Sequence, residues 1–423
     1  MRTLRFPQYP DIPNNEFTRD EILSMLAKEM LDAAELLPAS QSEVGRIHKY
    51  IALAYAAKIK LYQAYQQDET THAVTSINKE LLREVVSLCD QVTASNRYGL
   101  LDDFQGLDLV ANENGKESVF AIQYSMNDGT ESAGRINWSN LLNSPGGGSP
   151  YGGDGFFLPS QDLINAYQTD ANGLPDFNYQ SKSDYSWAVL NNGVYTLQNT
   201  TPNVDPRLDF VVGRPTITWK TYPDKPCEGW VRDKETYGYN CAKRFWVSPE
   251  SSDMFNGWPW GASQLNWQII RYADILLWKA EALIELNEGN GLETARDLIN
   301  QIRNRARNSA YVKDFNDHSN YAANYLVNPY PADVWNQDYA RQALRWETRL
   351  EKALEGERFF DLVRWGIVET TMNKYIAAES DNRIYYANAH FTGGKDEYYP
   401  VPNNQYGFSG GKYVQNPGYA PFN

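Results

Sequence analysis

Apolar residues recur at helical spacing in the first hundred residues of the chain. Over residues 16–38 they fall three and four positions apart, and Thr18 and Glu21 stand in the S/T-x-x-E spacing of a capping box. This pattern predicts a helix that ends before Pro38. Residues 46–66 predict a second helix, in which Ala52 and Ala56 let a neighbouring helix backbone approach closely. A third helix is predicted over residues 79–94, and the short connections favour antiparallel neighbours.

The pattern changes at residue 99 and changes back near residue 265. Between them lie short strand-like runs such as "ESVFAIQY", glycine clusters such as "SPGGGSPYGGDG", and many Pro, Asn and Asp turn signals. Helical periodicity then returns in "IIRYADILLWKAEALIELNEGN" and "LETARDLINQIRNRAR", and again over residues 339–366 with an interruption at Gly356. We therefore predict a mainly α protein. Its tetratricopeptide-like helical-hairpin scaffold comprises residues 1–98 and 265–423, and a large irregular insertion of loops and short strands spans residues 99–264. Hairpins on the two sides of the insertion are expected to share a core.

Charge narrows the possible ligands. The 423 residues include 53 acidic and 39 basic side chains, a net charge of −14, which disfavours the phosphate neutralisation on which nucleic-acid binding depends. No apolar run approaches the roughly 18 residues of a membrane-spanning helix, and the first residues lack the apolar core of a secretion signal. A neutral ligand fits this composition better than an anionic polymer.

Five motifs resemble the SusD/RagB family of outer-membrane nutrient-binding proteins from Bacteroidetes. In chain order they are "GFFLPSQDLINAYQTDANG", "DPRLDFVVGRP", "NWQIIRYADILLWKAEALIELN", "WETRLEKALEGERFFDLVRWG" and "EYYPVPNNQYGFSGGKYVQNPGY". The resemblance implies a tetratricopeptide-like scaffold without enzymatic activity or cofactor. It also implies a surface lipoprotein that faces outward on the outer membrane, binds oligosaccharides or polysaccharides (in some members peptides), and delivers them to a SusC-like TonB-dependent transporter.

The chain departs from the family pattern in two ways. In "ERRxELxxEGxRxxDLxRWG", Thr348 and Lys352 replace the usual Arg and Leu, so one ion pair and one apolar contact are expected to differ. The chain also enters the pattern only at "FPQYPDIP", after the position of the family's lipoprotein signal, acylated cysteine and first helical segment. The first repeat is therefore expected to leave apolar surface uncovered.

A strip of charge over residues 350–366 allows two interpretations. Glu351, Glu355 and Asp361 could be catalytic or metal-binding carboxylates, since two suitably spaced acids perform acid and base chemistry. Alternatively they form a structural ion-pair network with arginines such as Arg349 and Arg358, because a buried carboxylate without a partner costs several kcal/mol. We favour the structural interpretation, with Gly356 relieving the backbone at the helix break.

The irregular insertion holds the candidate ligand site. Seven of the twelve tryptophans lie between residues 187 and 267, and sugar rings stack their C–H faces on aromatic rings. For any single tryptophan we favour a place in the core, and Trp246 and Trp267 are expected there, but three or more exposed rings are expected to form a binding platform. The candidate ligand-binding residues are Tyr185, Trp187, Trp219, Tyr222, Trp230, Asn256, Trp258 and Trp260.

Other chemistry is sparse in the sequence. Cys227 and Cys241 could close a disulfide, and Cys89 is expected to be a buried free thiol. The four histidines and three cysteines lack the spacing of a zinc site, and no metal is predicted. Three functions stay open: a glycan receptor, a peptide-binding member of the same family, and a glycoside hydrolase. The hydrolase would take its acid pair from Asp154, Glu228 and Asp253.

Overall fold

Helices dominate the computed structural model. It describes residues 13–130, 134–138, 142–186, 188–191, 194–197, 202–224, 226, 228–238 and 240–422, with only the backbone at 188–191, 194–197, 228 and 235. The N-terminal helices are α1 (Arg19–Leu36), α2 (Lys49–Ala64) and α3 (Lys79–Thr93). The C-terminal helices are α7 (Tyr272–Leu286), α8 (Gly291–Asn308), α9 (Gln337–Glu351), α10 (Arg358–Arg364), α11 (Val368–Glu379) and α12 (Asn403–Phe408). The prediction of a mainly α fold is confirmed, whereas the tetratricopeptide-like character of the hairpins and the domain boundaries stay predictions.

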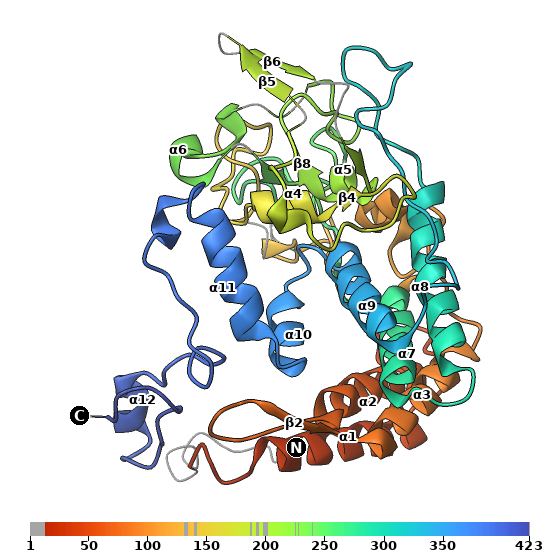
Figure 1. Cartoon of the computed structure of the whole chain (residues 1–423), viewed down its shortest axis with the longest axis vertical. Coiled ribbons are helices and arrows are strands. Elements are labelled where there is room, and N and C mark those ends of the chain that lie inside the picture. The colour runs from red at the N-terminus through yellow and green to blue at the C-terminus, as the bar shows by residue number, and fades with distance from the viewer. Residues whose placement is uncertain are drawn as a thin grey trace.

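The predicted irregular middle region contains short elements. Its helices are α4 (Gln161–Ala166), α5 (Arg207–Val211) and α6 (Lys234–Tyr237). Antiparallel two-stranded sheets join β3 (Ser118–Ile122) to β10 (Trp267–Arg271), β4 (Gln168–Thr169) to β7 (Asn203–Val204), β5 (Ala188–Asn191) to β6 (Val194–Leu197), and β8 (Val212–Gly213) to β9 (Cys241–Ala242). A further pair, β1 (Tyr65–Gln67) and β2 (Val74–Ile77), follows α2. In Figure 1 the middle region lies at the opposite end of the molecule from α1–α3, with α7, α8 and α9 between them.

The start of α1 confirms the predicted capping box. The Thr18 hydroxyl accepts a hydrogen bond from the Glu21 backbone N–H, and the Glu21 carboxylate accepts one from the Thr18 N–H at 2.9 Å. Both contacts satisfy backbone donors that a helix N-terminus otherwise leaves without partners. Ile22 and Met25 of α1 are exposed.

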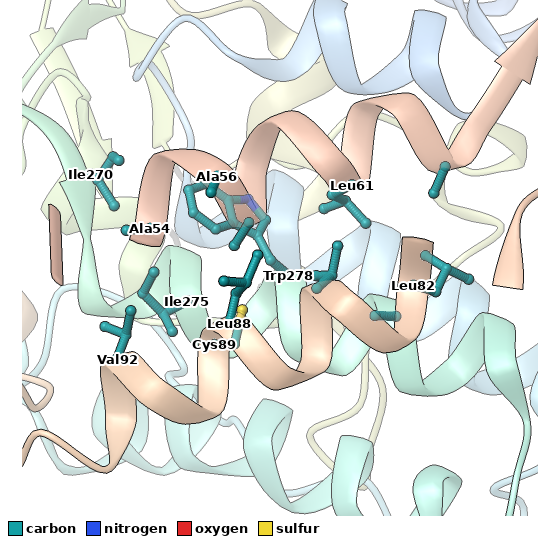
Figure 2. Close-up of a cluster of buried hydrophobic side chains, with 14 of the residues drawn as sticks. Ala54, Ala56, Leu61, Leu82, Leu88, Cys89, Val92, Ile270, Ile275 and Trp278 are labelled. Atoms are coloured by element: carbon teal, nitrogen blue, oxygen red, sulfur yellow. The ribbon is translucent and has the colours of Figure 1, made fainter. Parts of the chain in front are cut away.

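One hydrophobic core joins helices from both ends of the chain, as predicted. It combines residues of α2 and α3 with Ile275 and Trp278 of α7 and Leu362 of α10. Figure 2 shows Ala56 of α2 next to the Trp278 indole, with Leu88 of α3 beside it. Because Ala56 is fully buried, its small side chain lets α2 and α7 pack closely. The helices before and after the insertion therefore pack into one continuous scaffold.

The charged strip lies at the break between α9 and α10 and forms a buried ion-pair network. Glu351 is fully buried and contacts Arg271 at 3.1 Å, Arg207 at 3.2 Å, and Arg305. Burial by itself would raise the pKa of Glu351, but Arg305, Arg271 and Arg207 together hold it below its ordinary value. These contacts confirm the predicted ion-pair network.

Some details of that network differ from the prediction. Asp361 pairs with Arg364 at 2.9 Å rather than with Arg358. Arg358 instead donates to the backbone carbonyl of Arg345 at 3.3 Å. Gly356 has a φ of +85° in the break, a left-handed conformation that glycine adopts without strain.

The two departures from the family pattern are both accommodated. Lys352 is buried and pairs with Asp274 at 2.6 Å and Glu355 at 2.8 Å. Thr348 donates its hydroxyl hydrogen to the Leu344 carbonyl at 2.9 Å, one turn back along α9. An ion pair thus stands at the position where the family usually has an apolar contact.

Candidate functional site

Three of the predicted ligand-binding rings lie in the core. Trp219 and Trp230 retain 0% and 2% of their surface, with ring centroids 5.2 Å apart, and the Trp219 Nε1–H donates to the Tyr151 hydroxyl at 3.0 Å. Tyr185 retains 2% and belongs to a second cluster with Leu208. The expectation that these three rings face solvent is therefore wrong. A loop-rich region with few long helices fills its interior with large aromatic side chains instead.

The remaining aromatic candidates of this region have different environments. Tyr222 is partly buried, with its ring centroid 6.3 Å from that of Trp230. Trp187 lies outside the described residues. Trp246 is buried, as expected, and Trp267 packs on the same cluster with its ring centroid 4.6 Å from that of Phe245.

Trp258 and Trp260 are the predicted rings that face solvent. They are 62% and 49% exposed on a turn closed by a hydrogen bond from the Phe255 N–H to the Ala262 carbonyl at 2.9 Å. Pro259 between them is buried, and Asn256 on the same turn is exposed. Two large apolar rings held open to water on a closed turn are a feature of binding surfaces.

Trp138 joins this turn and was missed from the sequence. It is 41% exposed, and its ring meets that of Trp258 edge-on at a centroid distance of 5.2 Å and an angle of 74°. Asn137 fixes the segment, since its N–H donates to the Ser263 carbonyl at 2.9 Å and its side chain donates to the Leu265 carbonyl at 3.1 Å. The only local signal was a tryptophan among polar neighbours in "RINWSN". We call Trp138, Trp258 and Trp260 the aromatic surface.

A second segment supports the aromatic surface from beneath. The Ser144 hydroxyl donates to the Trp260 carbonyl at 3.2 Å, and the Ser144 carbonyl accepts from the Gly155 N–H at 2.9 Å. Phe156 follows directly and is 58% exposed, with the Arg232 guanidinium 4.5 Å from its ring centroid. Ser144 thus links the segment that carries Phe156 to the turn that carries Trp260.

Two of the acids considered for hydrolysis, Asp154 and Asp253, have side chains within the described part of the chain. Asp253 accepts hydrogen bonds from Gln264 at 2.6 Å and from Ser251 at 2.9 Å. Asp154 is exposed, and the side chain of Glu228 lies outside the described residues.

The structure describes two of the three cysteines. Cys89 is a buried free thiol, as predicted, whereas the pairing of Cys227 with Cys241 stays a prediction because Cys227 lies outside the described residues. Over the part of the chain that the structure describes, no group of three or more His, Cys, Asp or Glu side chains could hold a metal ion. None of the described helices combines the length and apolarity needed to cross a membrane.

Solved structures share this fold at low sequence identity. A SusD homolog from Bacteroides thetaiotaomicron superposes with a TM-score of 0.63 at 17% identity, covering 95% of this chain and 70% of that one. A structure described as a laminarin binding SusD-like protein gives a TM-score of 0.53 at 20% identity, covering 94% and 69%. Surface glycan-binding protein A from Bacteroides uniformis gives a TM-score of 0.56 at 18% identity, and the match covers 95% of this chain and 69% of that one. The last two of these proteins are described by name as binding proteins.

Family membership rests on sequence as well as on fold. No curated protein matches the chain. The SusD family profile, however, matches residues 116–419, which is well over half of the chain and includes all five motifs recognised in the sequence. The chain therefore belongs to the SusD family.

Proposed function

We propose that this protein is a non-catalytic glycan receptor of the cell surface. The aromatic surface carries the proposal, because Trp138, Trp258 and Trp260 present indole rings to solvent on a scaffold of the SusD family. Two structural relatives that are named for glycan or laminarin binding support a carbohydrate as the ligand.

Recognition would depend on ring stacking and hydrogen bonding. The C–H faces of pyranose rings stack on exposed indoles, and Asn256 beside them offers an amide to the sugar hydroxyls. Because Trp258 sits edge-on to Trp138, the two rings form a corner rather than a flat shelf. A corner suits a bent or branched oligosaccharide that contacts both rings.

The receptor would act outside the cell and pass its ligand on. Family membership favours a position on the outer membrane facing outward and delivery to a SusC-like TonB-dependent transporter. Co-purification of the protein with such a transporter would test this part, and failure to co-purify under conditions that preserve other such pairs would argue against it.

Affinity measurements on single-ring variants test the binding site. After a glycan array identifies a ligand, Trp258→Ala and Trp260→Ala are each expected to lower its affinity about 5- to 30-fold, as loss of a central aromatic residue does. Tyr399→Ala is the matched control, because Tyr399 is 91% exposed but lies in the C-terminal segment. Unchanged affinity in both tryptophan variants would remove the aromatic surface from the proposal.

The alternatives give distinct results in the same experiments. Release of new reducing ends from a polysaccharide would indicate the glycoside hydrolase. Quenching of tryptophan fluorescence by peptides but not by glycans would indicate the peptide-binding alternative.

A further inference from the structure

A cavity separate from the aromatic surface lies between α4, α9, α10 and α11. Its volume is about 750 Å³, and rings and aliphatic side chains form much of its wall, among them Leu163, Tyr179, Trp346, Phe359, Ile367 and Tyr375. This size falls within the range of about 300–1,000 Å³ that small-molecule sites occupy.

Two arginines on the cavity wall lack an acidic partner among the described residues. Arg345 of α9 makes no ion pair there, and the hydrogen bond that Arg358 of α10 makes is to the Arg345 carbonyl at 3.3 Å. Both guanidinium groups lie near the Trp365 ring, at 5.3 Å and 5.7 Å from its centroid. Contact with a ring offsets only part of the cost of removing a cation from water.

The carboxylates on the same wall are already engaged. Asp162 pairs with Arg349 at 2.6 Å. Asp361 pairs with Arg364 at 2.9 Å, and the exposed Asp338 pairs with Arg341 at 3.0 Å. Glu281 and Glu285, which attract Arg345 from further away, are bound by Arg364 and Arg341 respectively. The cavity thus keeps an excess of positive charge in a chain whose net charge is −14.

The environment of these arginines makes an anion the complementary ligand. Burial, with a smaller effect of the nearby Arg349, lowers the pKa of Arg358 to about 9, and burial also lowers the pKa of Arg345. With a pKa of about 9, Arg358 still carries its charge at neutral pH. A guanidinium group presents a planar set of donors that matches a carboxylate, and the bond gains strength where water is partly excluded.

We propose that this cavity binds a small ring-bearing carboxylate, whose acid group lies between Arg345 and Arg358 and whose body packs on the aromatic and aliphatic wall. The site goes beyond the proposed glycan receptor function, because it shares no residue with the aromatic surface. A uronic acid glycoside combines a ring with a carboxylate at this size, and it is the ligand class that we propose.

Matched probes isolate the contribution of the carboxylate. In calorimetric titrations of the full chain, 4-nitrophenyl β-D-glucuronide is expected to bind at least about tenfold more tightly than 4-nitrophenyl β-D-glucoside, which has the same ring without the acid. Digalacturonate and its methyl ester form a second pair. Failure of both acids to bind in the millimolar range, or equal affinity for acid and neutral partner, would overturn the proposal.

Variants separate a binding role from a structural one. Arg345→Gln and Arg358→Gln are expected to lower the affinity for the acidic probe about tenfold or more, while Arg307→Gln, which removes an exposed guanidinium outside the cavity wall, leaves it unchanged. Thermal unfolding without probe supplies the second readout. Because neither arginine holds an acid, their loss is expected to leave the midpoint unchanged or raised. A marked fall in both midpoints together with unaltered probe affinity would assign these arginines to the fold alone. Binding of an acidic peptide in preference to both glycuronides would overturn the choice of a small ligand.

Discussion

Glu351→Gln is the sharpest test of the buried ion-pair network at the break between α9 and α10. The substitution keeps the shape of the side chain and removes its charge. Arg271 and Arg305 contact one oxygen of the carboxylate, and Arg207 contacts the other. In the glutamine variant one of these atoms becomes an NH₂ group, which donates and cannot accept.

The expected loss follows from these three contacts. We expect the amide oxygen to take the position that accepts from both Arg271 and Arg305. The NH₂ group then lies against Arg207, which loses its acceptor. Hydrogen bonds to charged groups contribute about 1.5–3 kcal/mol and neutral ones about 1 kcal/mol. One lost and two weakened charged bonds therefore add up to roughly 3–5 kcal/mol, which agrees with the cost of breaking a buried ion pair. Arg207 still has Asp205 at 2.7 Å, which limits the damage.

Urea unfolding, followed by both tryptophan fluorescence and circular dichroism, measures the difference in the free energy of unfolding. Asp338→Asn is the matched control, because Asp338 lies on the same helix and pairs with Arg341, but its side chain is 94% exposed. That variant is expected to lose less than about 1 kcal/mol. Since the arginines lower the pKa of Glu351, its contribution is present above the ordinary pKa of a glutamate and disappears as the pH falls through the lowered value. Equal losses in the two variants at neutral pH would refute the reasoning.

Three further predictions concern single groups, of which Lys352 and Cys89 are buried and Glu113 is partly buried. Lys352→Leu, which restores the residue usual in the family, is expected to lower the free energy of unfolding by about 2–4 kcal/mol because it strands the buried Asp274. Lys28→Leu, at an exposed pair with Asp32, is its control, and similar urea midpoints for the two variants would contradict the prediction. Burial raises the pKa of Glu113 to about 7, so the folded protein retains this proton more tightly than the unfolded chain, and stability falls as the pH rises from about 4.5 to about 7. Glu113→Gln is expected to remove that loss, so that at pH 8 its free energy of unfolding exceeds that of the wild type by on the order of 1 kcal/mol, whereas at pH 4 the two are equal. An equal gain in stability at both pH values would show that titration of Glu113 is not the cause. Burial also raises the pKa of the Cys89 thiol to about 12, so iodoacetamide is expected to label Cys89 only in urea, and labelling of the native protein would show that the core around α3 opens.

The helical scaffold could be predicted because its signals are local. The capping box at Thr18 and Glu21, the small residues of α2 and the charged strip each depend on neighbours within one or two helical turns. The pairing of Glu351 with arginines could also be predicted from the sequence, because acids and arginines that alternate around a helix break need oppositely charged partners. Which arginines pair with Glu351 could not be predicted, because Arg207 and Arg271 lie far from it in the sequence.

Exposure of the rings in the insertion depends on distant backbone and could be predicted only in part. Trp230 is buried because the glycine-rich segment packs on it, with the Gly146 N–H donating to the Trp230 carbonyl at 2.7 Å. A Cβ at Gly148 would overlap the Gly229 carbonyl oxygen, so glycine is required for that approach. The glycine cluster was visible in the sequence as a set of turns. Its contact with the backbone of Gly229 and Trp230 appears only when the two segments meet in space.

The aromatic surface shows which local feature separates an exposed indole from a buried one in this region. Trp219 donates its Nε1–H to Tyr151, so its polar atom is satisfied inside the protein. Trp258 and Trp260 instead flank a buried proline on a turn that closes on itself through Phe255 and Ala262. Since Pro259 occupies the inward position of this turn, both indoles point away from the core together. Such a turn can therefore vary in its ring residues without disturbing the scaffold, which is the condition under which a receptor can change its ligand while it keeps its fold.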